Sequence, residues 1–398
     1  MNVILEVGFA IVGCVFLFIT AYLLLLAVAA MIPEKRLGSA SKTHRFAIVI
    51  PAHNESRILG TTLASIRELD YPGELVDVFV IADNCTDRTA SVAKKGNVHS
   101  LVRHDPDHWG KGYALDWGFS QILTAGHHEA FVVIDADTIV DSGFLQAVNR
   151  RLCEGARVVQ GYYDVQHPSS SPVESLSYLG FVARRLLRHR GRSKLGWSSN
   201  LLGNGMCFAR EILERFGWRT TSIVEDVEFG MLLQLEGVRV VFAEDAKVYA
   251  EIPSTFAGAA NQRGRWDLGK LRVARKFLFR LIREFFRRRD FSCLDAAMEL
   301  LIPPFPITIS LMTAGFVGFW LWGYTGLTPS LFIWLAVALN MGVYIFMCLI
   351  TAQAGFKVYL SLLYAPYFVV WRLYLMIRGA IQGKHKRRVQ TQRENRQE

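Results

Sequence analysis

The chain has 398 residues, enough for one large domain or two, with 51% hydrophobic residues and a mean hydropathy of +0.23. This hydropathy is high for a purely soluble protein. The formal net charge is +10, and none of the six cysteines forms a C-x-x-C pair, which excludes a zinc-finger spacing and a disulfide framework. A domain in a reducing compartment is compatible with this use of cysteine.

The first predicted element is an uncharged apolar stretch at residues 7–32, long enough for one membrane-spanning helix. A cleaved signal peptide fits less well, because the preceding residues carry Glu6 and no Lys or Arg, and because the stretch is longer than the apolar part of a signal peptide. Residues 27–30 resemble a cleavage site, so cleavage stays an alternative. We predict an N-terminal transmembrane helix within residues 1–34.

Residues 45–252 alternate short apolar runs with amphipathic stretches, which predicts an α/β domain. The rhythm favours a mainly parallel, Rossmann-like sheet with helices on both faces. Ligands of such sheets bind beyond the carboxyl ends of the strands. The predicted strands are residues 45–50, 76–82, 98–103 and 130–134, and the predicted helices are residues 56–69, 86–95 and 111–124.

Polar side chains follow the first two predicted strands. The segment Pro51-Ala52-His53-Asn54-Glu55 ends the first strand, and the Glu55 carboxylate can accept a hydrogen bond from a nucleobase or a sugar. We interpret His53 as a polar loop residue rather than a metal ligand. Asp83 ends the second strand and can accept hydrogen bonds from a base or a ribose, whereas Thr86 or Asp87 has N-cap chemistry for the next helix.

Two carboxylates, Asp135 and Asp137, follow the fourth predicted strand. Side chains two residues apart on an extended chain point the same way, so both carboxylates can reach one divalent cation that bridges a diphosphate. Mg²⁺ or Mn²⁺ suits such oxygen ligands. A solvated loop explains the pair equally well when it is taken alone. Lys111 lies between two glycines, but the chain has neither a P-loop motif nor a G-x-G-x-x-G motif.

Glu225 and Asp226 precede a predicted helix. A carboxylate there can deprotonate an acceptor hydroxyl, although acidic residues also stabilise a helix simply by lying near its N-terminus. Gly205 belongs to a glycine-rich turn at residues 203–206, which either lines an acceptor pocket or is only a tight turn.

The segment Gln262-Arg263-Gly264-Arg265-Trp266 places two guanidinium groups and an indole close together. Arginine binds diphosphate oxygens through paired hydrogen bonds, and tryptophan can stack on a sugar; anchoring at a membrane surface is the alternative. Residues 270–289 are cationic with interleaved apolar side chains, which suits either nucleic acid or anionic lipid. We interpret residues 253–296 as amphipathic interfacial helices on lipid, because an apolar segment follows directly, and we expect no nucleic-acid partner.

The C-terminal part is again apolar. Residues 300–356 carry no charge, and a turn at residues 323–326 divides them into two predicted spans. Residues 357–381 contain two arginines and either span the membrane or lie in its interface. Lys and Arg near span ends stay cytoplasmic, so an odd number of spans, with residues 357–381 on the surface, is favoured. Residues 297–383 thus form C-terminal membrane segments, and residues 384–398 form a basic polar tail.

The ordered set of motifs resembles the inverting family 2 glycosyltransferases, which have a GT-A catalytic domain. The resemblance runs from Arg45 to Trp266. Residues 262–266 are similar to the Q-x-x-R-W element of cellulose, chitin and hyaluronan synthases, and residues 82–90, 110–115 and 161–163 look like the bacterial exopolysaccharide branch.

The resemblance implies transfer of a sugar, with inversion, from a nucleotide-diphosphate donor, preferably a UDP-sugar, to a growing polysaccharide or a lipid-linked glycan. Asp226 would be the catalytic base, and Asp137 with Asp135 would hold Mg²⁺ or Mn²⁺ and the donor diphosphate. The other implied donor-binding residues are Pro51, Ala52, Glu55, Asp83, Lys111, Arg263 and Arg265. The implied acceptor-binding residues are Gly205, Glu225, Gln262 and Trp266.

The resemblance also implies a multi-pass protein of the bacterial inner (cytoplasmic) membrane with its catalytic domain in the cytoplasm. Membrane lipid and other polysaccharide-export proteins would be its partners. Large processive synthases carry more spans than are predicted here. A transferase that adds a single sugar to a lipid-linked acceptor is therefore an alternative, and a non-catalytic module that senses nucleotide or lipid is another.

Overall fold

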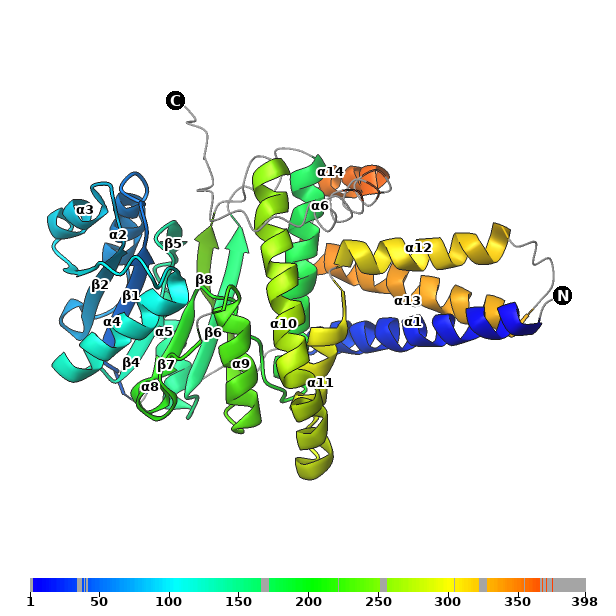
Figure 1. The fold of residues 1–398 in the computed structure, drawn as a ribbon, viewed down its shortest axis with the longest axis horizontal. Helices are drawn as coiled ribbons and strands as arrows, with labels where there is room; N and C mark the ends of the chain where they lie inside the picture. Colours follow the sequence, from blue (N-terminus) through cyan, green and yellow to red (C-terminus); the bar gives the residue numbers. More distant parts are fainter. Residues whose placement is uncertain are drawn as a thin grey trace.

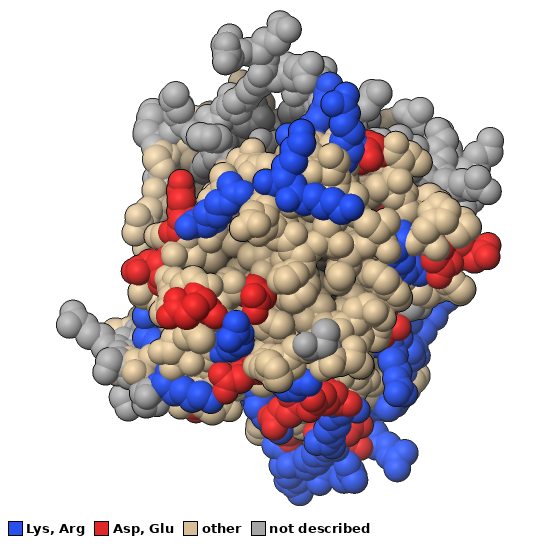
Figure 2. All heavy atoms as spheres, turned by 90° about the vertical axis from the view of Figure 1, so that its left-hand side faces the viewer, with Lys and Arg blue, Asp and Glu red and all other residues tan. Residues whose placement is uncertain are grey.

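The structure is a computed structural model. It describes residues 3–33, 38, 40, 42–165, 172–220, 222–250, 256–303, 305–321, 328–353, 355–365, 367, 370 and 374. An α/β domain and a bundle of apolar helices lie next to each other, and the long helix α10 (Phe256–Arg288) runs crosswise between them (Figure 1). On the face of the domain turned away from the bundle, acidic and basic side chains are interspersed (Figure 2).

An eight-stranded sheet with the order β3-β2-β1-β4-β7-β6-β8-β5 forms the centre of the domain. In its first half, β1 pairs in parallel with β2 and β4, and β2 pairs in parallel with β3. In the second half, β6 and β8 are parallel, while β7 is antiparallel to β4 and β6, and β5 is antiparallel to β8. The predicted α/β architecture with a mixed, mainly parallel sheet is confirmed. The strands are β1 (Phe46–Ala52), β2 (Val76–Asp83), β3 (His99–Arg103), β4 (Ala130–Val133), β5 (Thr138–Val140), β6 (Val158–Val165), β7 (Met206–Ala209) and β8 (Val240–Ala250).

Both faces of the sheet are covered by helices. Because side chains alternate along a strand, Ile48 and Ile50 of β1 belong to one hydrophobic core and Val49 belongs to the other. The first core includes α2 (Leu59–Arg67), α3 (Thr89–Lys95) and α5 (Phe144–Cys153). The second core includes α4 (Lys111–Ala125), α8 (Arg210–Phe216) and α9 (Glu225–Leu235). Burial on both faces explains why the parallel strands are continuously apolar.

Two helices begin three residues later than the sequence predicts. Helix α2 begins at Leu59 instead of residue 56, since Asn54 has a positive φ of 56° and the chain turns before the helix starts. Helix α3 begins at Thr89 instead of residue 86, because the Asp87 carboxylate accepts a hydrogen bond from the Thr89 backbone N–H at 2.9 Å. Local turn chemistry therefore sets both boundaries.

Helix α10 buries part of the apolar side that the sequence assigns to lipid. Val273, Phe277 and Leu281 pack against Met231 of α9 and Leu300 of α11 (Phe291–Leu301). On the opposite side, apolar residues stay exposed among arginines; Phe279 is 82% exposed and Phe286 is 71% exposed. The helix thus attaches to the domain along one side and leaves a basic and aromatic side open.

The apolar bundle consists of α1 (Val3–Ala30), α12 (Phe305–Leu321) and α13 (Pro329–Thr351). The short α14 (Phe356–Ser361) lies beside α6 (Pro172–Phe181) (Figure 1). Within α1 and α13, the segments Glu6–Ala30 and Pro329–Thr351 are long and apolar enough to cross a membrane, whereas the apolar part of α12, Ile307–Trp320, is shorter. Many outward apolar side chains are exposed, including Leu339 at 68%. The predicted turn at residues 323–326 and most of residues 366–398 lie outside the described residues.

A buried ion-pair network joins the domain to the bundle. Arg192 of α7 (Arg188–Lys194) is 0% exposed; it donates to Asp295 Oδ2 at 2.8 Å and to Glu299 Oε2 at 2.8 Å. Arg188 donates to the same Glu299 oxygen at 3.0 Å, and the hydroxyl of Tyr22 in α1 donates to Asp295 at 2.6 Å. Burial alone would raise the pKa of Glu299, but the two arginines hold it well below its usual value. The network therefore links α1, α7 and α11 through charged groups.

Candidate active site

The carboxyl ends of β1, β2 and β4 meet at one edge of the sheet, as expected for neighbouring parallel strands (Figure 1). Pro51 lies opposite Ile81 and Ala52 opposite Ala82 in the β1–β2 register. Just beyond, a ring nitrogen of His53 lies 2.7 Å from the carbonyl oxygen of Asp83. The predicted donor-binding residues Pro51, Ala52 and Asp83 are therefore neighbours in space.

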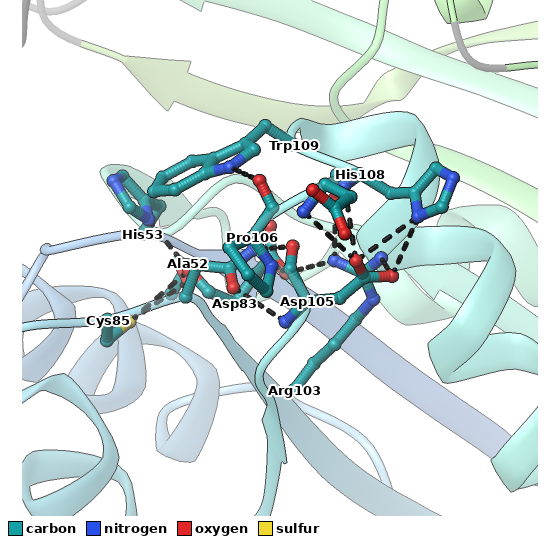
Figure 3. Close-up of polar contacts among 11 residues, drawn as sticks. Ala52, His53, Asp83, Cys85, Arg103, Asp105, Pro106, His108 and Trp109 are labelled. Atoms are coloured by element: carbon teal, nitrogen blue, oxygen red, sulfur yellow. Dashed lines mark hydrogen bonds and ion pairs between the residues drawn. The ribbon is translucent and has the colours of Figure 1, made fainter.

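The Asp83 carboxylate is held in a buried ion pair (Figure 3). Arg103 Nη1 donates to Asp83 Oδ1 at 2.6 Å, and both side chains are more than nine-tenths buried. Asn84 Nδ2 also donates to Asp83 Oδ1, at 3.1 Å, and Arg103 Nη2 pairs with Asp105 Oδ2 at 2.8 Å. Both contacts to Asp83 use Oδ1, so they fix the orientation of the carboxylate without using Oδ2. Sequence reasoning did not identify Arg103 or Asp105.

An exposed indole lies beside this ion pair (Figure 3). The ring of Trp109 meets the ring of His53 edge-on with centroids 5.3 Å apart, and its indole N–H donates to the carbonyl of Pro106. Arg103 supports the same loop by donating to the carbonyl of His108 at 2.9 Å. A half-exposed aromatic face next to Asp83 is suited to stacking on a flat ring.

Lys111 connects two loops at the centre of the site. Its amino group pairs with the carboxylate of Asp135 and donates to the carbonyl of Gly203 at 2.5 Å. Asn204 Oδ1 accepts from the Asp135 backbone N–H at 3.2 Å, and Asn204 Nδ2 donates to the Thr138 hydroxyl at 2.8 Å. Burial would lower the pKa of Lys111, but Asp135 and Glu225 raise it above its usual value, so the amine is a fixed positive charge.

Asp135 and Asp137 have the oxygen atoms that a divalent cation prefers, and a bound phosphate would supply further oxygen ligands. Burial raises the pKa of Asp135, Lys111 opposes the rise, and the charge of Asp137 adds to it, so the two carboxylates repel each other. Within the part of the chain that the structure describes, no three His, Cys, Asp or Glu side chains form a metal-binding group. One or two carboxylates completed by substrate phosphate oxygens is, however, a common way for proteins to bind Mg²⁺.

Glu225 and Asp226 begin α9 and face the same site. A Cβ atom on Gly203 would lie 3.2 Å from Asp226 Oδ2 and 3.7 Å from the Lys111 amino nitrogen. Gly203 also has a φ of +81°, so glycine suits the backbone there and lets the two charged groups approach. Burial raises the pKa of Asp226, and the Val227 backbone N–H, Lys111 and Arg184 oppose the rise. Burial and then the charge of Asp226 raise the pKa of Glu225 to about 7.

The raised pKa of Glu225 predicts a pH-dependent stability. The folded chain keeps the Glu225 proton up to about pH 7, whereas the unfolded chain releases it near 4.5, so the free energy of unfolding falls as pH rises between these values. A Glu225→Gln variant lacks this titration. Between pH 4.5 and 7, we expect the free energy of unfolding of this variant to rise relative to that of wild type by about 3 kcal/mol. Unfolding temperatures from scanning fluorimetry in detergent report this change.

The control is Glu236→Gln, at the exposed C-terminal end of the same helix, which should shift the unfolding temperature equally at every pH. Parallel pH profiles for wild type and Glu225→Gln would contradict the assignment.

The remaining predicted site residues have structural contacts of their own. The backbone N–H of Glu55 donates to the Thr89 hydroxyl at 2.8 Å, which holds the turn after β1. Gly205 has a φ of +66°, and a Cβ atom there would lie 2.9 Å from Val248. The backbone conformation of Gly205 and the lack of room for a side chain there agree with a tight turn. The acceptor-binding role of Gly205 and the nucleoside-binding role of Glu55 stay predictions.

Residues 262–266 lie in the first turns of α10, and the side chains of Gln262, Arg263, Arg265 and Trp266 lie outside the described residues. Helix α10 starts at the edge of the sheet where β6 and β8 end (Figure 1). The roles assigned to these four side chains therefore stay predictions.

Two arginines that sequence reasoning missed lie on a π-helical turn, η2 (Val182–Leu187), between α6 (Pro172–Phe181) and α7. They are Arg184 and Arg185, and the guanidinium carbon of Arg185 lies 3.8 Å from the centre of the Tyr163 ring. A π-turn shifts the helical register by one residue, so the 3.6-residue periodicity of the sequence does not show which way these arginines point.

Comparisons with known proteins give consistent matches. The model of a family described as "Glycosyltransferase like family 2" matches residues 44–269, more than half of the chain. A probable glycosyltransferase YdaM from Bacillus subtilis (strain 168) is 26% identical over 59% of this chain and 57% of its own length. A poly-beta-1,6-N-acetyl-D-glucosamine synthase from Staphylococcus epidermidis is 25% identical over 60% of this chain and 58% of its own length. The chain thus matches somewhat more than half the length of these curated relatives.

Among solved structures, the fold is similar to that of the mannosyltransferase PcManGT from Pyrobaculum calidifontis, in complex with GDP-Man and Mn²⁺. The TM-score is 0.60 and the sequence identity is 19%, and the similarity covers 94% of this chain and 97% of the other. At this identity the likeness concerns the fold alone.

Proposed function

Because the chain belongs to glycosyltransferase-like family 2, with relatives in polysaccharide synthesis, we propose that it is a membrane-bound inverting glycosyltransferase. It transfers a sugar from a nucleotide-diphosphate donor, preferably a UDP-sugar, to a growing polysaccharide or a lipid-linked glycan. The observation that carries the proposal is the meeting of Lys111, Asp135 and Asp226 around Gly203 at the carboxyl edge of the sheet.

The donor occupies the β1–β2–β4 side of this edge. Asp83, oriented by Arg103, and Glu55 hold the nucleoside, and Trp109 offers its exposed face to the base. Lys111, together with the predicted arginines of residues 262–266, neutralises the diphosphate. Mg²⁺ or Mn²⁺, held by Asp135 and Asp137, would supply further positive charge to the leaving diphosphate. Association of a related fold with GDP-Man and Mn²⁺ is consistent with this donor class.

The transfer itself needs a base on the acceptor side. Asp226 takes the proton of an acceptor hydroxyl, whose oxygen attacks the anomeric carbon of the sugar. The bond from that carbon to the diphosphate oxygen breaks on the opposite side, which inverts the configuration. Lys111 is already positioned by Gly203 and Asp135, so its charge stabilises the diphosphate without rearrangement.

The experiment is a screen of nucleotide sugars for release of nucleoside diphosphate by purified protein with Mg²⁺ or Mn²⁺. Turnover of at least one sugar supports the proposal, and turnover of none contradicts it. Gel sizing of the product separates a polymer, which residues 262–266 favour, from a single addition, which the small number of predicted spans favours. Calorimetric binding of a donor without turnover would support a non-catalytic sensing module instead.

Attachment to the bacterial cytoplasmic membrane, with the α/β domain on the cytoplasmic side, is part of the proposal. Helices α1 and α13 supply apolar segments of sufficient length, and relatives include a polysaccharide synthase. Helix α10 lies crosswise at the base of the bundle, with Phe279 and Phe286 exposed among arginines (Figure 1). This side of α10 suits the headgroup region of a bilayer that contains anionic lipid.

We expect turnover in phosphatidylglycerol nanodiscs to be several-fold higher than in phosphatidylcholine nanodiscs, because each Arg near an anionic surface adds about 1 kcal/mol of attraction. Replacing Arg283 and Arg287 of α10 with Gln should remove this preference. The matched control replaces Arg67 of α2 and Lys95 of α3, which are exposed at the far end of the domain (Figure 1). Equal preference in both double variants would contradict a lipid contact through α10.

A further inference from the structure

Arg185 is held in place by aromatic rings. Its guanidinium carbon lies 3.8 Å from the ring centre of Tyr163 at the end of β6 and 4.4 Å from that of Phe181 in α6. Such stacking fixes the plane of a guanidinium and leaves its N–H groups directed outward from the ring faces. Its hydrogen bond to protein is a long one of 3.5 Å to the Tyr163 carbonyl.

The described part of the chain supplies no ion-pair partner to either arginine. Among the described residues, no carboxylate oxygen lies within 4.0 Å of Arg184 or Arg185. Burial lowers the pKa of Arg185, which shows that the charge is partly removed from water. A half-buried cation without a carboxylate partner is unfavourable in the free protein and becomes favourable when an anion binds.

The two arginines lie within electrostatic range of the carboxylates of the proposed active site. The charge of Arg185 acts on Asp135, and the charge of Arg184 acts on Asp226. Asp135, Asp137 and Arg185 all act on the Tyr163 ring, whose pKa burial raises. The carboxylates and the guanidinium groups are thus close enough to influence each other's charge, a proximity that suits a phosphate bound between a carboxylate-held cation and the arginines.

Arg184 and Arg185 lie on η2, away from the strands that carry the proposed nucleoside-binding residues. Tyr163 belongs to β6, which is separated from β1 by β4 and β7 in the sheet, whereas Asp83 and Arg103 belong to β2 and β3 on the other side. Segment η2 also contacts α13 and α1 of the apolar bundle. Arg184 and Arg185 therefore belong to the segment of the domain that adjoins the bundle.

We propose that Arg184 and Arg185 form a binding site for a phosphoryl group in the acceptor half of the active site. The assignment to the acceptor half rests on the proposed glycosyl transfer, because only in that reaction is the ligand beside Asp226 the acceptor. The phosphoryl group belongs either to a lipid-linked acceptor or to the donor diphosphate, and the location beside the bundle favours the acceptor.

Calorimetry with the full-length protein in detergent tests this site. The probes are inorganic pyrophosphate with Mg²⁺, for the donor source, and a short-chain prenyl phosphate in micelles, for the acceptor source. We expect Arg185→Gln to raise the Kd for the prenyl phosphate about 10- to 100-fold, the typical effect of losing charge-assisted hydrogen bonds. Arg184→Gln should weaken binding less, since its side chain is exposed and not held by a ring.

Two controls separate binding from folding. Arg215→Gln removes an arginine that also stacks on an aromatic ring, Phe216 at 4.8 Å, but lies on α8 away from the carboxylates. It should leave both Kd values unchanged. Arg185→Lys keeps the charge and should restore part of the affinity, and thermal unfolding shows whether each variant is folded.

The outcomes are distinct. Weaker binding of the prenyl phosphate alone assigns the site to a lipid-linked acceptor, and weaker binding of pyrophosphate alone assigns it to the donor. Unchanged Kd values for both probes in folded Arg185→Gln, or no binding of either probe to wild type, overturn the proposal. If no nucleotide sugar is turned over but Arg185 still governs phosphate binding, the glycosyl-transfer function fails while the phosphate site stands.

Discussion

The rate of sugar transfer by an Asp226→Asn variant is expected to be about 10²- to 10⁴-fold lower than that of wild type, which is the usual contribution of a positioned general base. Asn keeps the size and polarity of the side chain but cannot take the acceptor proton. Because Asp226 has no proposed contact with the donor, and because Asn fills the same space beside Gly203, the Kd of the donor should stay within a few-fold of wild type. Release of nucleoside diphosphate measures the rate, and calorimetry measures donor binding.

The matched control is Glu228→Gln, two residues further along α9, whose carboxylate pairs with Lys276 of α10 at 2.6 Å. This variant should retain nearly full activity. An Asp226→Asn enzyme with wild-type rates would remove Asp226 from the mechanism, and equal losses in both variants would indicate damage to α9 rather than loss of a base.

Replacing Arg192 with Leu should be strongly destabilising. The substitution leaves Asp295 and Glu299 buried without their shared cation, and removal of one partner from a buried ion pair costs about 3–5 kcal/mol. We expect a fall of many degrees in unfolding temperature, measured by scanning fluorimetry in detergent. Adding Asp295→Asn to Arg192→Leu should recover part of the loss, since one uncompensated charge is removed.

Arg190→Gln provides the comparison on the same helix. Arg190 pairs with Glu244, and both side chains keep about a quarter of their surface exposed, so its loss should cost about 1 kcal/mol or less. Similar costs for Arg190→Gln and Arg192→Leu would show that the network does not hold the domain to the bundle.

The carboxylates of the site could be predicted because their position depends on strand ends. Asp83 and Asp135 each follow an apolar run, and in a parallel sheet such ends meet at one edge. The ion pair between Asp83 and Arg103 could not be predicted in the same way. It depends on the carboxyl end of β3 lying beside that of β2, and no local pattern marks Arg103 as the partner.

The cationic helix shows a different limit. Phe277, Phe279 and Phe286 are equally apolar in the sequence, yet Phe277 packs against α9 and α11 while the other two stay exposed. Amphipathic spacing shows that one side of a helix is apolar, but it does not say whether protein or lipid covers that side. Only the packing of α9, α10 and α11 distinguishes these residues.

The helical segment formed by α6, η2 and α7 carries Arg184 and Arg185 near the carboxylates. One and two turns later, it carries Arg188 and Arg192 into the network with α1 and α11. The proposed phosphate-binding residues and the residues of the buried network therefore share one helical segment. In the proposed membrane-bound enzyme, we expect a bilayer thickness that changes the tilt of α1 to change the affinity for the ligand as well, because the buried network connects α1 to this segment.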